Sequence, residues 1–508
     1  MAAIHVESRL RRLIGKFRWI HAAPLLAVIA LGAWAVASPV GASPDDDYHL
    51  VSTWCALGGS DACTRVDDPN MRRVSTAFGA SACYAMIAER SAACQYRHGL
   101  ALDGPTEETI RGNFQDKYPD VFYGVMRLFA GQDLERSVLV MRLVNVLLFV
   151  GLATLVAAML SVSRRQTLLW GWLVTMVPLG MFLIPSNNPS GWATTGVGMA
   201  FMALMGWFES GGRRRWVLGA LYVVGIVMAA GSRSDGAIYA GGATLVASLL
   251  TWSRTRDWRL RSMLPLAGLV IVLLLFLTTH QADVGVGGIS GGNSGAAPGS
   301  VGGAVEPTGG IALAAYNILM VPYLWTGVWG TWALGWFDTV LPAVVPWASA
   351  AAFVVVGFAG LGLLNRRKAV AVVGVLAVLL LFPVYLLTAG GDAVGSQFQP
   401  RYLLPLVVLL GLVLVIATPG RRTVRFTQTQ TVIILSALAV ANLVALQVNI
   451  RRYVTGADEQ GFHLSSGAEW WWDGAPVGPT AVWLVGSLAF AGLLAVLWPE
   501  LRRKSVAP

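Results

Sequence analysis

Residues 9–40 read RLRRLIGKFRWIHAAPLLAVIALGAWAVASPV, a basic run followed by an apolar run from Trp19 to Val40. A helix of about 20 apolar residues crosses the roughly 30 Å hydrocarbon core of a bilayer. Basic residues beside such a helix stay on the cytoplasmic side. The stretch therefore predicts a transmembrane helix over 19–40 after a cytoplasmic basic tail over 1–18. Small residues near Ser38 resemble a signal-peptide cleavage site, but the apolar run is long for a signal peptide, so we expect no cleavage.

The composition extends this prediction to the whole chain. Of its 508 residues, 55% are hydrophobic and 13% charged, whereas soluble domains are about 45–50% apolar and 25% charged. Further apolar segments lie near 137–160, 167–185, 191–208, 216–231, 236–252, 263–279, 343–364, 369–389, 403–418, 431–449 and 480–498. We therefore expect an all-α polytopic membrane protein with about twelve transmembrane helices. Helices two to seven fall within 137–279, and helices eight to twelve within 343–498.

Basic clusters orient these segments. They recur at every second connection and again in the last residues, 499–508. Because cationic loops remain cytoplasmic, both termini are expected in the cytoplasm and the chain in the cytoplasmic membrane. The net charge of +10 follows from the same pattern. It gives no reason to expect a nucleic acid partner.

The external loop over 41–136 is too long and too polar for a simple connector, so we expect a small folded unit. All four cysteines lie in it: Cys55, Cys63, Cys83 and Cys94. Such clustering predicts two disulfides in an oxidising compartment, and four cysteines allow three pairings. Proximity favours Cys55 with Cys63 and Cys83 with Cys94. A zinc site is disfavoured because no CxxC spacing occurs.

Two further external features are expected. Apolar spacing over 71–93 predicts short helices on the membrane face, and four aromatic residues suggest an interfacial belt: Tyr118, Phe122, Tyr123 and Phe129. The second external stretch, 280–342, begins with a glycine- and serine-rich part over about 281–310 that we expect to be a mobile loop. Its tryptophan-rich remainder predicts an interfacial or re-entrant segment.

The sequence SPDDDYH over 43–49 places three carboxylates directly outside the first helix. Mutual repulsion and lost hydration raise the pKa of at least one of them, as a general base requires. We expect Asp45 to be that base, helped by Asp46. Alternatively, Ser43 or Asp45 simply caps a helix that starts near Asp46. A magnesium or manganese ion held by Asp45, Asp46 and His49 also stays open, although no cofactor is required.

Four external arginines stand out because the other short loops on that side carry almost no basic residue: Arg233, Arg401, Arg451 and Arg452. A guanidinium suits a phosphate, and Arg401 with Tyr402 immediately precedes a predicted helix. The alternative for each arginine is contact with lipid headgroups. Arg142 enters the second helix, where it either faces the bundle interior or reaches the membrane surface. Asn187 and Asn188 lie in a short turn, where asparagine often serves turn geometry.

Seven motifs in order resemble the DUF2142 family of bacterial membrane proteins, which is similar to GT-C glycosyltransferases. They are PDDDYH (44–49), YPDVFY (118–123), RLVN (142–145), SNNPS (186–190), ALGWFDTVLP (333–342), QPRYLLP (399–405) and RYVTG (452–456). The chain departs from the family pattern at Asp46, where glutamate is usual, and at Pro400, where glycine is usual. SNNPS also lacks the aspartate that often ends its turn. These departures leave the choice of substrate open.

The resemblance implies a GT-C architecture with an acid of the first external loop as base and a polyprenyl-phosphate sugar as donor. The acceptor is a glycan or glycolipid of the cell envelope, and direct displacement inverts the anomeric centre. Residues expected at the donor phosphate are Arg401, Tyr402, Arg233, Lys117 and Arg451. Residues expected at the transferred sugar or the acceptor are His49, Asp47, Tyr118, Asn187, Asn188, Trp336, Asp338 and Gln399.

Two other classes of function compete with this prediction. A transporter or flippase of polyprenyl-linked lipids would suit a similar number of helices, but transporters place ionisable groups near the membrane midplane. In this sequence the charges gather at helix ends. A non-catalytic partner in envelope assembly would use the disulfide-bonded loop for docking. Abundant alanine, glycine, valine, tryptophan and arginine suggest a GC-rich actinobacterial source, for which arabinofuranosyl and mannosyl donors are the first to test.

Overall fold

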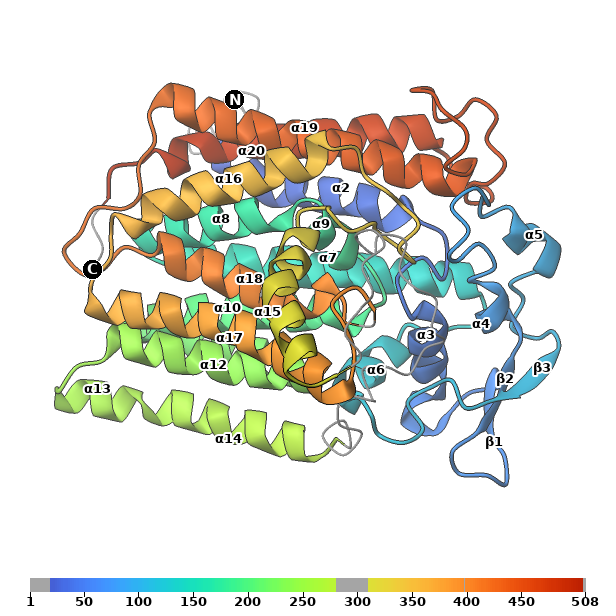
Figure 1. The fold of residues 1–508 in the computed structure, drawn as a ribbon, viewed down its shortest axis with the longest axis horizontal. Helices are drawn as coiled ribbons and strands as arrows, with labels where there is room; N and C mark the ends of the chain where they lie inside the picture. Colours follow the sequence, from blue (N-terminus) through green and yellow to red (C-terminus); the bar gives the residue numbers. More distant parts are fainter. Residues whose placement is uncertain (1–18, 280–308, 397, 506–508) are drawn as a thin grey trace, which may run out of the picture.

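The computed structural model describes residues 19–279, 309–396 and 398–505. The predicted tail over 1–18, the glycine-rich part over 280–308 and the last residues, 506–508, lie outside this range. Long helices run side by side, and a small mixed unit formed by 41–136 covers one end of them (Figure 1). We call this end the domain end. The opposite end is called the basic end, because it carries the connections 160–165, 210–215 and 362–368.

Each apolar segment predicted from the sequence is occupied by a helix, with boundaries shifted by a few residues. The segment 167–185 is divided at Val177 and Pro178 into two helices. The helices outside the 41–136 unit are η1 (Trp19–Ala22), α2 (Ala23–Val36), α7 (Leu134–Met159), α8 (Val162–Met176), α9 (Leu179–Leu183), α10 (Pro189–Glu209), α11 (Gly212–Ala230), α12 (Ser234–Thr251), α13 (Arg256–Arg261), α14 (Met263–Leu277), α15 (Gly310–Gly327), α16 (Val344–Leu361), α17 (Arg366–Gly390), α18 (Pro400–Val415), α19 (Gln428–Val454) and α20 (Pro479–Leu501).

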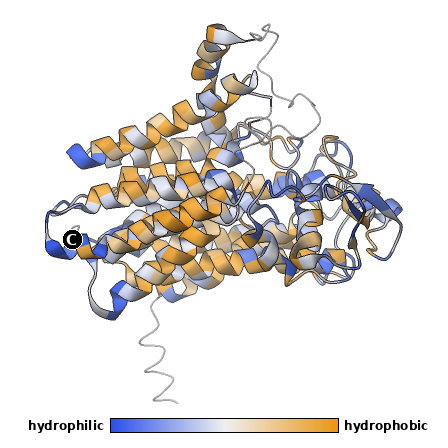
Figure 2. Ribbon diagram, turned by 90° about the horizontal axis from the view of Figure 1, so that it is seen from below, coloured by the Kyte–Doolittle hydropathy of each residue, from blue (hydrophilic) through white to orange (hydrophobic). Residues whose placement is uncertain are grey.

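Within the described residues, 7 helices are long and apolar enough to cross a membrane: α7, α13 with α14, α15, α16, α17, α19 and α20. Two shorter apolar helices, Ile20–Val36 and Pro400–Val415, accompany them. Figure 2 shows hydrophobic residues along the helices and hydrophilic residues gathered at both ends of the bundle. The chain is therefore a multi-pass membrane protein, but the predicted count of about twelve spans is not confirmed.

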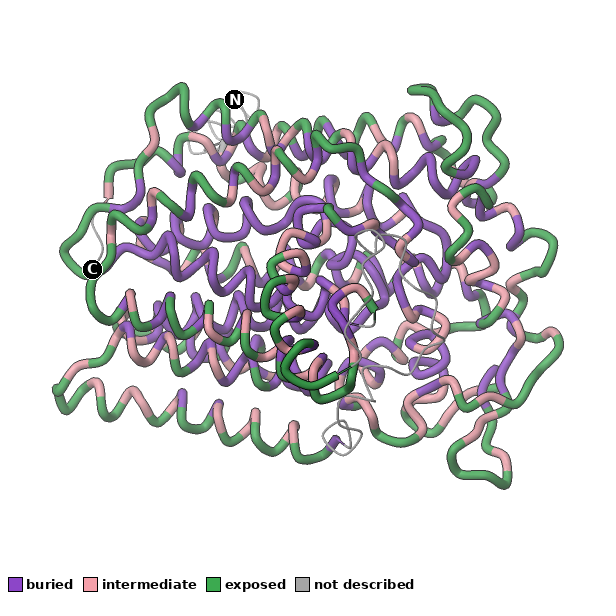
Figure 3. Tube along the Cα trace, in the orientation of Figure 1, coloured by how far each residue is buried: buried purple, intermediate pink, exposed green. Residues whose placement is uncertain are grey.

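The centre of the bundle contains α10 and α18, which are buried along almost their whole length (Figure 3). The close approach of α10 and α11 depends on small residues. A Cβ atom added to Gly196 would lie 2.4 Å from the carbonyl oxygen of Gly225. Small residues that let helix backbones approach in this way are typical of membrane helix packing.

Helix α15 differs in direction from the others. It runs across the neighbouring helices α17 and α18 instead of alongside them (Figure 1). It leads into a loop that carries Trp329, Trp332 and Trp336. This is the segment for which the sequence suggested an interfacial or re-entrant course, although its length and composition also suit a span.

The unit over 41–136 is a mixture of short elements. They are α3 (Asp46–Cys55), η2 (Ala56–Gly58), β1 (Cys63–Arg65), β2 (Arg72–Ser75), α4 (Ala77–Ala80), α5 (Cys94–His98), β3 (Thr106–Thr109) and α6 (Asp120–Arg127). The strands form an antiparallel sheet in the order β1-β2-β3, in which Val74 pairs with Cys63 and Glu107. The sequence predicted short helices here and missed this sheet, because each strand has only 3 or 4 residues.

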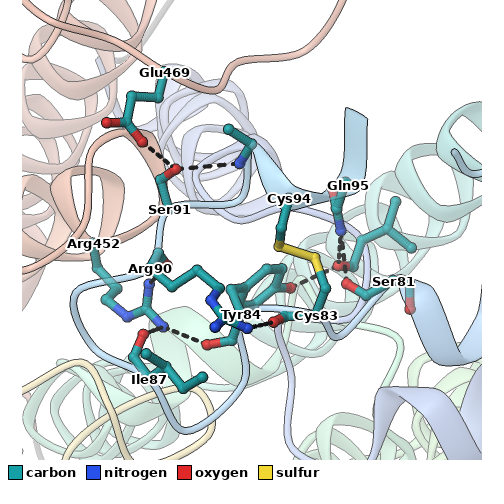
Figure 4. The surroundings of a disulfide bond; sticks show 12 residues. Ser81, Cys83, Tyr84, Ile87, Arg90, Ser91, Cys94, Gln95, Arg452 and Glu469 are labelled. Carbon is teal, nitrogen blue, oxygen red and sulfur yellow. Dashed lines mark hydrogen bonds between the residues drawn. A yellow bond between two sulfur atoms is a disulfide. The ribbon is translucent and has the colours of Figure 1, made fainter. Parts of the chain in front are cut away.

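Two disulfides join Cys55 to Cys63 and Cys83 to Cys94, so the pairing favoured by proximity is confirmed. The second disulfide lies beside a contact between distant parts of the chain (Figure 4). There, the guanidinium of Arg452 in α19 donates to the carbonyl oxygens of Tyr84 and Ile87, both at 3.0 Å. These hydrogen bonds fix the 41–136 unit onto the bundle.

The predicted aromatic belt is wrong for two of its four members. Phe122 and Tyr123 in α6 are buried instead of facing the membrane surface. The ring of Phe122 packs edge-on against that of Trp192 in α10, with centroids 5.4 Å apart. The apolar face of α6 covers the domain end of the bundle, where burial removes more apolar area from water than an interfacial position would.

Candidate functional site

The site begins at Asp45, which directly precedes α3. Its backbone is left-handed, with φ 63° and ψ 19°, a conformation that non-glycine residues seldom adopt. Although Asp45 occupies the N-cap position, its side chain makes no capping hydrogen bond to the helix. It accepts hydrogen bonds from Arg401 and, at 3.2 Å, from Nη2 of Arg111. The alternative interpretation, in which Asp45 only caps α3, thus explains where the helix starts but not which groups this side chain contacts.

Arg401 reaches the same place from the first turn of α18, 356 positions away in sequence. Its Nη1 donates to the carbonyl oxygen of Pro44 at 2.7 Å, and its Nη2 to the hydroxyl of Tyr402 at 3.1 Å. The Arg401 side chain is 4% exposed, whereas that of Asp45 is 31% exposed. Arg401 therefore faces Asp45 inside the protein and does not reach out to lipid headgroups.

The electrostatic setting of Asp45 follows from these contacts. Burial alone would raise the pKa of its carboxyl group, but the positive charges of Arg401 and Arg111 outweigh burial and hold that pKa well below its usual range. Asp45 is consequently ionised at neutral pH. Part of the Asp45 side chain remains accessible from outside the protein.

Asp46 has a different environment from its neighbour. It is fully buried, and its Oδ2 accepts from the backbone N–H of Ser43 at 3.2 Å. Among the residues that the structure describes, its Oδ1 has no partner. Burial raises the pKa of Asp46 to about 7, although Arg142 and the Ser43 N–H act in the opposite direction. The raised pKa that the sequence predicted for the base, Asp45, is therefore found at Asp46 instead. Because the carboxyl group of Asp46 is buried, an acceptor cannot reach it. It influences Asp45 through its charge.

Arg142 lies in the interior of the bundle, one of the two positions expected for it. It is buried, and it donates to the carbonyl oxygens of Ala35 at 3.0 Å and Pro39 at 2.7 Å. These carbonyl groups belong to the last turn of α2 and the chain just after it, where helical partners are missing. Arg142 thereby holds the segment that leads from α2 to Asp45.

Asp47 is held by Arg111, whose Nη2 lies 2.9 Å from Oδ1 and whose Nε contacts Oδ2. The same guanidinium therefore bridges Asp45 and Asp47. Sequence reasoning missed Arg111, because the 41–136 unit contains many arginines and nothing in their spacing distinguishes this one. Its contacts exist only because the chain after β3 returns to α3.

His49 is buried one turn further along α3. Its Nδ1 lies 2.8 Å from the hydroxyl of Tyr123, and its Nε2 has no partner within the described residues. Burial lowers the pKa of His49 well below its usual value, so the ring is neutral at physiological pH. In the part of the chain that the structure describes, no group of three His, Cys, Asp or Glu side chains could hold a metal ion.

Arg233, immediately before α12, extends the cluster of cations. It forms a two-bond ion pair with Asp235, at 2.8 and 3.0 Å. Its guanidinium carbon also lies 4.6 Å from the ring centroid of Tyr402 and 5.5 Å from that of Tyr118, within the range of cation–π contacts. Three of the residues expected at the substrate therefore lie together near Arg401: Arg233, Tyr402 and Tyr118.

The asparagine turn between α9 and α10 supports the site. Asn188 caps α10 by accepting from the N–H of Ser190 at 3.0 Å, and its Nδ2 donates to the carbonyl oxygen of Pro44 at 2.9 Å. Pro44 thus accepts hydrogen bonds from both Asn188 and Arg401. These bonds fix the residue before Asp45.

A small cavity borders Arg401, between α9, the start of α18 and the loop after α15. Its lining includes Pro44, Trp332, Gln399 and Arg401. Three buried polar atoms of these residues have no partner in the described part of the chain: Nε1 of Trp332, Oε1 of Gln399 and Nε of Arg401. Unpaired buried polar atoms are uncommon in native proteins, and their presence around one cavity is typical of a place where water or a polar ligand binds.

Three residues expected at the substrate take no part in the contact between Asp45 and Arg401. Lys117 is half-buried in the loop before α6. Arg451 donates to the carbonyl oxygens of Gly461 and His463, at 2.7 and 3.1 Å. Asn187 is buried in the turn before α10, and both polar atoms of its side chain lack a partner among the residues described.

Two further expected residues, Trp336 and Asp338, link the loop after α15 to its surroundings. Trp336 donates from Nε1 to the carbonyl oxygen of Gly41 at 2.8 Å. Asp338 forms an ion pair of 2.7 Å with Arg452. Both side chains therefore hold the domain end together and do not contact Asp45.

Replacement of Asp338 by alanine is expected to lower the free energy of unfolding by about 3 kcal/mol, because removing one partner of a buried pair leaves the other charge uncompensated. Both side chains of the Asp338–Arg452 pair are at most 2% exposed. The matched control is Glu108→Ala, which breaks a pair with Arg73 in which both side chains are about half exposed. The control should cost less than about 1 kcal/mol. Denaturant unfolding in detergent micelles measures both, and equal effects would contradict the linking role of Asp338.

Comparison with known proteins bears on this arrangement. A family model described as "Predicted membrane protein (DUF2142)" matches residues 28–410, well over half of the chain. The matched range contains Asp45, Arg233 and Arg401, and the family resemblance seen in the sequence motifs is thereby confirmed. No curated protein matches the chain.

Proposed function

The chain belongs to the DUF2142 family of predicted membrane proteins, and we propose that it is a membrane glycosyltransferase of the GT-C type. It transfers a sugar from a polyprenyl-phosphate donor to a glycan or glycolipid acceptor of the cell envelope. The reaction takes place on the external face of the cytoplasmic membrane, at the domain end of the bundle. Both chain termini are cytoplasmic in this proposal.

The observation that carries the proposal is the contact between Asp45 and Arg401. The partly accessible side chain of Asp45 lies against the buried guanidinium of Arg401. Two further guanidinium groups lie in the same cluster: that of Arg233, which is paired with Asp235, and that of Arg111, which bridges Asp45 and Asp47. An acceptor hydroxyl needs a carboxylate that it can reach, and a departing phosphate needs fixed positive charge. Both requirements are met within one cluster of side chains at the end of the bundle.

The proposed reaction is a single displacement. Asp45 accepts the proton of the acceptor hydroxyl while the hydroxyl oxygen forms a bond to the anomeric carbon of the donor. The bond between that carbon and the phosphate oxygen breaks, and the phosphate leaves with the electron pair. Arg401 and Arg233 stabilise the charge that develops on the phosphate. Attack opposite the leaving group inverts the anomeric centre, and no covalent sugar–protein intermediate is formed.

Donor binding itself activates the base in this scheme. In the free protein Arg401 and Arg111 hold the pKa of Asp45 low, which makes Asp45 a weak base. A phosphate that takes Arg401 as its partner brings negative charge next to Asp45 and withdraws part of the positive charge. Both changes raise the pKa of Asp45 towards the working pH, where general base catalysis is most effective. Asp46, behind it, contributes further negative charge as pH rises through about 7.

The Arg111→Gln variant is expected to shift the pH dependence of kcat, which reports the pKa of Asp45 in the donor-bound protein. The base acts in its ionised form, so activity is lost as pH falls through the pKa of Asp45. Because Arg111 is one of the arginines that depress this pKa, its removal raises the pKa and the loss begins at higher pH. The control is Arg73→Gln at an exposed ion pair, which should leave the profile unchanged. An unshifted acid limb in Arg111→Gln would argue against Asp45 as the titrating group.

The function is tested with a panel of synthetic prenyl-phosphate sugars, starting with arabinofuranosyl and mannosyl donors. The full-length protein in lipid nanodiscs is incubated with each donor and a small glycan acceptor, and products are analysed by mass spectrometry and by NMR of the anomeric proton. We expect at least one donor to give a glycoside of inverted configuration and an equal amount of prenyl phosphate. Retention of configuration would overturn the single displacement.

The distribution of ion pairs favours an enzyme over a transporter. Among the described residues, Asp45–Arg401, Arg233–Asp235 and Asp338–Arg452 lie at the domain end, and Arg164–Glu209 and Arg165–Glu500 lie at the basic end. A transporter of a charged lipid needs ionisable groups along its path through the membrane. The middle of this bundle is instead filled by the apolar side chains of α10 and α18.

A further inference from the structure

An apolar groove runs between α2, α7, α8 and α20, separate from the Asp45 site. Its volume is about 480 Å³, within the range of roughly 300–1,000 Å³ that is usual for ligand pockets. The groove is open because α2 lines it with small residues, among them Ala23, Ala27 and Ala30. Two further alanines, Ala153 and Ala157 of α7, also line it.

The positive charge of the lining lies at one end of the groove. Going along α8, the lining changes from Arg165 to Leu168, then to Trp172 and Met176. Arg165 is at the basic end, where its Nη1 lies 2.9 Å from Oε1 of Glu500 at the end of α20. The groove therefore begins beside charged groups at the basic end and becomes apolar along α8.

The depth of the groove corresponds to one leaflet of a membrane. From Arg165 to Met176 the helix advances by about 16 Å, and half of the roughly 30 Å hydrocarbon core is about 15 Å. Apolar walls at this depth disfavour water, and leaving the space empty forfeits dispersion contacts on every side. A hydrocarbon chain of the surrounding leaflet has the length and the chemistry to fill it.

The charged residues around Arg165, which lines the groove at its basic end, indicate which lipid headgroup fits. Glu500 is approached by two arginines, Arg165 at 2.9 Å and Arg503 at 3.8 Å. One carboxylate between two guanidinium groups leaves one positive charge uncompensated. The Arg503 side chain is 47% exposed, so it can contact a phosphate at the membrane surface.

We propose that this groove binds one acyl chain of an anionic glycerophospholipid from the leaflet at the basic end, with the lipid phosphate beside Arg165 and Arg503. Such a lipid fills the space between α2, α8 and α20 and stabilises the packing of these helices. This site is independent of the proposed sugar transfer. Its lipid is a structural ligand and is not consumed.

Native mass spectrometry of the full chain, released from nanodiscs that contain equal amounts of phosphatidylglycerol and phosphatidylcholine, tests the proposal. The wild-type protein should retain one phosphatidylglycerol molecule. In the Ala153→Phe variant the added ring fills the groove, so retention of the lipid should fall at least about tenfold. This is the loss expected if the ring displaces only two methylene groups of the acyl chain. The matched control is Ala351→Phe, which adds the same ring on the exposed face of α16 and should leave retention unchanged.

A second variant tests the headgroup. The Arg503→Gln variant removes an exposed charge without touching the groove wall, and it should reduce the preference for phosphatidylglycerol over phosphatidylcholine while a lipid is still retained. Equal retention by the wild type and Ala153→Phe would overturn the proposal, as would the absence of a retained lipid. When polyprenyl phosphate is added, its retention in place of phosphatidylglycerol would also overturn the proposal, because the ligand would then belong to another lipid class.

Discussion

The Asp45→Asn variant is expected to transfer sugar about 10²–10⁴ times more slowly than the wild type, the usual contribution of a general base. The amide cannot accept the proton of the acceptor hydroxyl. The fold should be preserved, because asparagine is among the residues that best tolerate the left-handed backbone found at this position. Initial rates with the best donor of the panel, measured in nanodiscs, give the result directly.

The matched control for this variant is Asp67→Asn, in the exposed loop between β1 and β2. It makes the same chemical change in the same 41–136 unit and should leave the rate of transfer unaltered. The two rival functions give other outcomes. If Asp45→Asn lost export of polyprenyl-linked lipid and kept sugar transfer, the transporter would be favoured. If both activities were normal and only complex assembly failed, the docking function would be favoured.

Arg401 is the second position at which a large effect is expected. The Arg401→Gln variant removes the charge that faces the departing phosphate, and transfer should fall about 10²–10³-fold, as when one preorganised donor is lost from a site of charge development. The Arg401→Lys variant keeps the charge but loses the planar fork that contacts Pro44, Asp45 and Tyr402. Its rate should lie between those of the wild type and Arg401→Gln.

Because Arg401 is buried, folding must be followed in the same samples. Unfolding of Arg401→Lys and Arg401→Gln is compared with that of Arg451→Gln, which removes an arginine bound to loop carbonyl groups outside the Asp45 cluster. We predict normal transfer by Arg451→Gln. If folded Arg401→Gln transferred sugar as fast as the wild type, Arg401 would have no part in stabilising the leaving phosphate.

The helices and disulfides could be predicted because their signals are local. Each apolar segment had a length and composition that only a membrane or a buried helix explains, and the two disulfides join cysteines that are 8 and 11 positions apart. The number of spans could not be fixed in the same way. Helices such as α10 are surrounded by protein, and lipid exposure and burial in protein leave similar apolar patterns in a sequence.

The sequence predicts Asp45 as the base and Arg401 at the donor phosphate, because both residues adjoin predicted helices on the external side of the membrane. The different environments of Asp45 and Asp46 had no such basis. They depend on the left-handed turn at Asp45, which directs one carboxylate to Arg401 and leaves the next one buried. Two adjacent aspartates offer no sequence signal for that turn.

Arg111 and the inward course of α6 were missed for a related reason. Both depend on how the 41–136 unit folds back onto the bundle, and that unit is organised by long-range contacts such as those made by Arg452. Aromatic residues near charges suit a membrane interface and a buried helix face equally well. Only the packing of Phe122 against Trp192 distinguishes the two.

The joint action of Asp45 and Arg401 is tested most directly by a double-mutant cycle, with kcat/KM for the best donor measured for Asp45→Asn, Arg401→Gln and the combined variant. When two residues act together on one reacting group, replacing either of them removes most of their joint effect. We predict that the combined variant is about as slow as the slower single variant. Losses that multiply, as they do for residues that act independently, would contradict a site in which this carboxylate and this guanidinium work on the same transfer.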